Sequence, residues 1–65
     1  MNEEVIKKHW ELIKLSALHR YLPDQSHAAI SELVTAYGQK VDTSCGACIF
    51  DMMERLYNMY KNTWQ

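Results

Sequence analysis

The stretch from Ser44 to Trp64 constrains the fold more than any other part of this chain. Apolar residues recur in it every three or four positions, which is the spacing of a helix that buries one face against other helices. Ser44 suits the position before such a helix, because its hydroxyl can accept a hydrogen bond from a free backbone N–H of the first turn. We therefore predict a helix over residues 44–63. Its buried face would carry Cys45, Cys48, Ile49, Met52, Met53, Leu56, Tyr57, Tyr60 and Trp64.

Two further helices are predicted before it. Residues 3–21 carry an apolar stripe at helical spacing, and Pro23 then breaks the helix, since proline disfavours helical geometry in the preceding residue. Residues 24–37 form the second helix, and Gly38 ends it because glycine enters the left-handed conformation without steric cost. The sequence thus predicts an all-α, three-helix domain over residues 1–65. The stripe of the first helix would be Ile6, Trp10, Ile13, Ala17 and Tyr21.

Charge and hydropathy narrow the classes of partner. The chain has seven Lys and Arg against eight Asp and Glu, without the basic excess that phosphate contacts require, so a nucleic-acid partner is not expected. It has no run of about 18 apolar residues, so no membrane span is expected. The first residues, MNEEVIKK, lack the order of a signal peptide, which favours the cytoplasm. There cysteines stay as thiols or bind metal.

The segment Cys45-Gly46-Ala47-Cys48 allows several interpretations. A pair at the start of a helix suits a thioredoxin-like redox site, but no strand or βαβ pattern accompanies it. The pair is also half of a tetrahedral zinc site that His19 and His27 could complete, although the seven residues between these histidines exceed the usual three to five. An intermolecular disulfide or a reactive thiol is a third possibility. The simplest interpretation is burial of Cys48, with or without Cys45, as a small apolar residue on the helix face.

No group of residues predicts an enzyme. The histidines, serines and carboxylates do not form a pattern in which a base is oriented beside a nucleophile. The segment HRYLPDQSHAAISELVTAYG has roughly the length of a helix-turn-helix, but its second helix would present Glu32 where a DNA phosphate lies. The possible zinc ligands and this helix-turn-helix length together leave a zinc-stapled or DNA-associated regulator as the alternative function.

A second apolar surface predicts contact with another protein chain. Leu15, Leu18 and Leu22 lie about 100° round the first helix from its main stripe. Phe50 and Met59 project away from the main stripe of the last helix. Methionines and aromatic residues are favoured on surfaces that accept a partner. We expect a homo-oligomer or a module that binds a larger protein, with contacts from Leu15, Leu18, Leu22, Phe50, Tyr57 and Met59.

The segment LVTAYGQKVDTSCGACIFDMMERLYNMY, from Leu33 to Tyr60, resembles a class of very small helical proteins and domains encoded by bacteriophages and prophages. The shared features are a short helix that ends near Tyr-Gly, a polar connection, and Ser-Cys-x-x-Cys at the start of a helix with a later Leu-Tyr. The resemblance implies a virion component, or a factor that binds and modulates a host protein, rather than an enzyme. It would place the protein in the host cytoplasm or the virion, and it supplies no catalytic residues.

Overall fold

The computed structural model describes residues 2–64, which form helices joined by turns and irregular segments, without a strand in that range. It contains α1 (Glu3–Lys8), α2 (Trp10–His19), α3 (His27–Tyr37) and α4 (Gly46–Tyr60). The predicted all-α class is confirmed. The predicted number of helices is corrected from three to four, because the first predicted helix is divided in two.

The division falls at His9. Its backbone dihedrals, φ −103° and ψ 22°, lie outside the helical region, so the chain bends between α1 and α2. Backbone hydrogen bonds still bridge the bend, since His9 N–H donates to Val5 O at 3.2 Å and Ile13 N–H donates to His9 O at 3.0 Å. The bend allows α1 to pack against α3 while α2 packs against α4.

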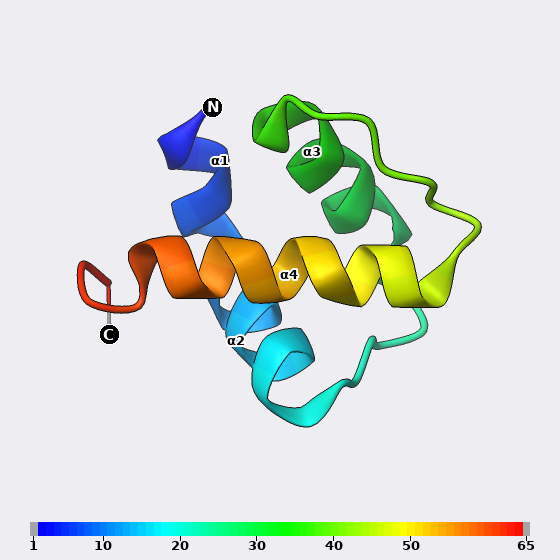
Figure 1. Ribbon diagram of the computed structural model, residues 1–65, viewed down its shortest axis with the longest axis horizontal. Coiled ribbons are helices and arrows are strands. Elements are labelled where there is room, and N and C mark those ends of the chain that lie inside the picture. The colour runs from blue at the N-terminus through cyan, green and yellow to red at the C-terminus, as the bar shows by residue number, and fades with distance from the viewer. Residues whose placement is uncertain (1, 65) are drawn as a thin grey trace.

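Helix α4 is the centre of the arrangement. In Figure 1 it runs across the view, with α1 and α3 above it and α2 below and behind it. Its apolar face closes the core on the other three helices, and Met53 and Leu56 in that face are completely buried. The buried core residues are Ile6, Trp10, Ile13, Ile30, Leu33, Ala36, Tyr37, Ile49, Met52, Met53, Leu56 and Tyr60.

Four aromatic side chains fasten the end of α4 to the start of α2. The Trp10 ring stacks on Tyr57 with centroids 5.8 Å apart and meets the edge of Trp64 at 5.5 Å. Trp64 in turn stacks on Tyr60 at 4.3 Å. Such ring pairs add about 0.5–1.5 kcal/mol each beyond the area they bury. They hold the turn that follows α4 against the body of the domain.

The chain leaves α2 through a left-handed residue. Arg20 has φ 49° and caps α2, and its N–H donates to Ser16 O at 2.9 Å. The buried Ser16 hydroxyl donates to Tyr21 O at 3.1 Å and so fixes the turn. Because the helix ends at His19, Tyr21 does not continue its stripe. The prediction that Tyr21 belongs to the buried stripe is wrong, since this side chain is 55% exposed.

The structure confirms the predicted end of the next helix and corrects its predicted beginning. Gly38 caps α3 at φ 79°, as predicted. Helix α3 begins at His27 rather than at residue 24, because the Ser26 hydroxyl donates to Pro23 O at 2.7 Å and closes a turn over residues 23–26. None of the helices in residues 2–64 has the length and apolar character needed to cross a membrane.

The conformation of Arg20 gives a prediction about stability. Arg20→Gly and Arg20→Ala both remove the guanidinium, but only glycine adopts φ 49° without steric cost. We expect the glycine variant to be more stable than the alanine variant by about 1 kcal/mol. Urea unfolding followed by far-ultraviolet circular dichroism measures the difference. Equal midpoints in the two variants would contradict a strained Arg20 backbone.

Candidate functional site

The four residues predicted to bind zinc do not form one site. Cys45 and Cys48 are joined by an intramolecular disulfide with their Cα atoms 5.2 Å apart. His19 is the last residue of α2 and His27 is the first residue of α3. Across residues 2–64, no group of three or more His, Cys, Asp or Glu residues is placed to hold a metal ion. The predicted tetrahedral site is therefore not assembled in this structure.

The disulfide lies at the beginning of α4. Cys45 is the N-cap of this helix, and its Sγ accepts a hydrogen bond from Cys48 N–H at 3.1 Å. The prediction that Ser44 is the cap is wrong. The Ser44 hydroxyl and N–H instead both donate to Asp42 Oδ1, at 2.6 and 3.0 Å. These two hydrogen bonds lower the pKa of the Asp42 carboxyl.

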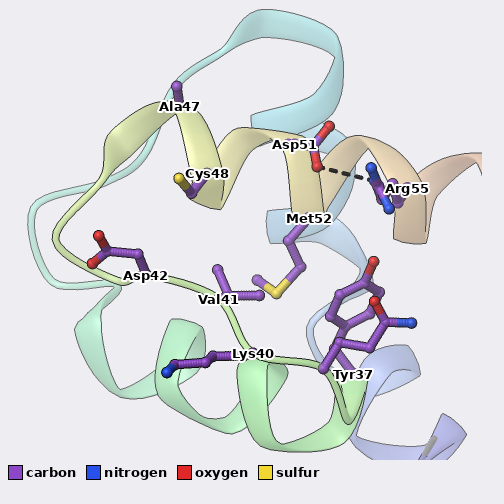
Figure 2. A pocket seen from close by; sticks show the side chains of 10 residues that line it. Tyr37, Lys40, Val41, Asp42, Ala47, Cys48, Asp51, Met52 and Arg55 are labelled. Atoms are coloured by element: carbon purple, nitrogen blue, oxygen red, sulfur yellow. Dashed lines mark ion pairs between the residues drawn. The ribbon is translucent and has the colours of Figure 1, made fainter.

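An open hollow of about 430 Å³ adjoins the disulfide, between α4 and the segment that follows α3. Figure 2 shows Val41 and Met52 at its apolar centre, with Cys48 on one wall. On the α4 side, the Arg55 guanidinium lies 3.0 Å from Asp51 Oδ2. The Tyr37 hydroxyl and Asp51 together raise the pKa of Arg55. The opposite charges of Asp51 and Arg55 at the edge of the hollow therefore partly neutralise each other.

A second candidate site is the outward side of α2. We call it the α2 outer face, and it consists of Glu11, Lys14, Leu15, Leu18 and His19. Leu18 is 56% exposed and Leu15 is half-buried. Lys14 Nζ lies 3.1 Å from Glu11 Oε1 within the same helix. The face therefore combines two leucines with a neutral pair of charges, and all five of its residues belong to α2.

The other predicted contact residues do not continue this face. Leu22 and Tyr57 pack against the core. Phe50, which we expected to project outward, is half-buried, and the Arg20 guanidinium carbon lies 4.9 Å from its ring centroid. Met59 is 50% exposed, but it is nine residues from Phe50 and so lies on the opposite side of α4. The six predicted residues therefore do not make one surface.

The structure adds an interaction that the sequence did not indicate. His9 Nε2, at the bend between α1 and α2, lies 2.6 Å from Glu32 Oε1 in α3, and Lys8 Nζ lies 3.7 Å from the same oxygen. The hydrogen bond with His9, followed by the charge of Lys8, lowers the pKa of the Glu32 carboxyl. These residues are far apart in the chain, so no local pattern could have identified the contact.

Comparison of the chain with models of protein families, with curated proteins and with solved structures found no match. The geometry of the two candidate sites is therefore the basis for assigning a function to this protein.

The His9–Glu32 contact predicts how stability depends on pH. Because folding lowers the pKa of Glu32 from its ordinary value of 4.5, the stabilisation is full above pH 4.5. It is lost as the pH falls through the folded-state pKa. We expect Glu32→Gln to flatten this acid-side loss when urea midpoints are measured between neutral and acidic pH.

The matched control is Asp51→Asn, which also removes an exposed carboxyl but whose ion pair with Arg55 lies within α4. It should keep the pH dependence of the unaltered protein. An identical acid profile for the Glu32→Gln variant and the unaltered protein would contradict a stabilising role for this contact.

Proposed function

We propose that this protein acts without catalysis, through contact with other protein chains, and that a second copy of the chain binds its α2 outer face. The observation that carries the proposal is the exposure of Leu18, at 56%, beside Leu15 on a helix whose opposite side is fully used by the core. In residues 2–64 the large apolar side chains that are exposed are Leu18, Tyr21 and Met59. Leu18 belongs to α2, and Tyr21 follows the residue that caps this helix.

The order of residues along the α2 outer face favours a second copy as the partner. Glu11 lies near the beginning of α2 and His19 at its end, with Leu15 midway between them. Two copies of α2 that pack antiparallel about a twofold axis bring the two Leu15 side chains together at the centre. Glu11 of each helix, which is paired with Lys14, then lies opposite His19 of the other. A twofold interface requires this kind of self-complementarity.

The area of the α2 outer face determines how tightly we expect two copies to bind each other. A stable interface usually buries about 800 Å² on each partner. One face of a ten-residue helix is smaller than that. We therefore expect a weak, reversible dimer that forms as the concentration rises, rather than an obligate one.

The predicted phage or prophage setting, as a virion component or a modulator of a host protein, is compatible with such a contact surface and stays a prediction. No observation favours the alternative of a zinc-stapled or DNA-associated regulator. In that alternative α3 would face DNA, yet Glu32 places a carboxylate on this helix and already binds His9 and Lys8.

Replacement of Leu18 tests the proposal. Leu18→Asp places a charge beside Leu15 on this face, so we expect the dimer to be lost while helix content is retained, because Leu18 is not part of the buried core. Sedimentation velocity over a range of protein concentrations measures the association, and circular dichroism measures the helix content.

Met59→Asp is the matched control, because Met59 is exposed to a similar extent, 50%, but lies on α4. It should leave the association unchanged. Loss of association in the Met59→Asp variant with none in the Leu18→Asp variant would assign the interface to α4 instead. A monomer at all concentrations for the unaltered protein would reject self-association altogether.

A further inference from the structure

The Cys45–Cys48 disulfide lies where an external thiol can reach it. Both cysteines are only half-buried, and Gly46 and Ala47 between them are exposed. Nothing approaches within 4 Å of the position that a Cβ on Gly46 would occupy, so the outer side of this turn is open. Cys48 also lines the open hollow beside α4 (Figure 2). Access of this kind distinguishes an exchangeable disulfide from an inert, buried one.

The two sulfur atoms have different surroundings. Cys45 Sγ already accepts the Cys48 N–H at 3.1 Å, at the N-terminus of a fifteen-residue helix. A negative charge on this sulfur is stabilised by that donor and by the helix dipole. Cys48 is the third residue of the helix. Cys45 is therefore the sulfur that is better suited to carry the charge of a thiolate.

The backbone accommodates both the joined and the open pair. The Cα separation of 5.2 Å lies within the ordinary range for a disulfide, so the bond can form without moving the helix. The capping hydrogen bond to Cys45 Sγ does not require the S–S bond, because a thiolate accepts it equally. The packing that holds α4 comes from Ile49 onward, beyond the pair.

From these observations we propose that Cys45 and Cys48 form a reversible dithiol–disulfide couple, which exchanges with low-molecular-weight thiols at Cys45 while the fold is kept. In the closing direction the Cys45 thiolate attacks one sulfur of an external disulfide, the external S–S bond breaks, and one external thiolate leaves and takes a proton. The Cys48 thiol then loses its proton and attacks Cys45 Sγ, so that the second external thiolate leaves and the protein S–S bond forms. One external disulfide is reduced and the protein dithiol is oxidised, and the same steps in reverse open the protein disulfide at the expense of two external thiols.

This activity is separate from the proposed contact through α2, and it does not need a thioredoxin-like fold. It requires only a reachable pair, a stabilised thiolate and a backbone that suits both states. A thioredoxin-like redox site is not expected in this chain, because it has no βαβ pattern. The disulfide, its exposure and the Cys45 capping bond now support exchange on the helical fold itself.

A titration with reduced and oxidised glutathione tests the couple. The full chain is equilibrated at neutral pH, unreacted thiols are alkylated, and the mass of the protein is measured. We expect a single reversible transition in which both cysteines change together, with the far-ultraviolet circular dichroism spectrum retained in both states. A disulfide that opens only after unfolding, or thiols that never close at any ratio, would overturn the proposal.

Two single-cysteine variants test the role of Cys45. Cys48→Ser keeps the capping sulfur, whereas Cys45→Ser keeps only the sulfur inside the helix. We expect the Cys48→Ser variant to form a mixed disulfide with oxidised glutathione at least about twofold faster than the Cys45→Ser variant, because the Cys45 thiolate is better stabilised. Equal rates, or a faster reaction of the Cys45→Ser variant, would overturn the assignment of Cys45 as the exchanging residue. Circular dichroism of both variants establishes that each is folded during the measurement.

Discussion

The packing of Trp10 against α4 is the interaction on which the rest of the structure depends. Trp10 is the first residue of α2, and its ring meets Tyr57 of α4 and Trp64 beyond it. These contacts align α2 with α4, and the chain must therefore bend at His9 for α1 to reach α3. The indole Nε1–H of Trp10 is buried without an acceptor in residues 2–64. Ring packing must offset this cost of about 1–3 kcal/mol.

The same packing leaves the α2 outer face and the Cys45–Cys48 disulfide exposed on two different helices. Helix α2 uses one side for the core, through Trp10, Ile13 and Ser16, and this leaves Leu18 in solvent on the other side. Helix α4 uses its face from Ile49 to Tyr60 for the core and leaves the disulfide at its first turn half-exposed. One site is therefore the partly apolar α2 outer face, and the other is the half-exposed Cys45–Cys48 disulfide.

The sequence predicted most of what depends on local pattern. The apolar period of α4 identified Met53, Leu56 and Tyr60 as core residues, and the structure buries all three. Gly38 was identified as the end of α3 from its backbone freedom alone. Leu18 was identified as part of a second surface, and it is exposed. In each case the property depends on residues within one or two turns of the same helix.

The remaining features were decided by contacts between distant parts of the chain. No proline or glycine marks the bend at His9, where α1 turns toward α3 and the His9 side chain meets Glu32, 23 residues away. Phe50 has the position of an exposed residue on α4, but the left-handed turn at Arg20 brings a guanidinium over its ring. The cysteine spacing allowed a redox pair, a metal site, an intermolecular disulfide or simple packing, and only the fold separated His19 and His27 from the pair and joined Cys45 to Cys48 within one chain. The sequence by itself determined the helical class and the face of each helix, because these depend on periodicity. The tertiary structure decided the bends, the pairings and the sites, because they depend on which distant surfaces meet.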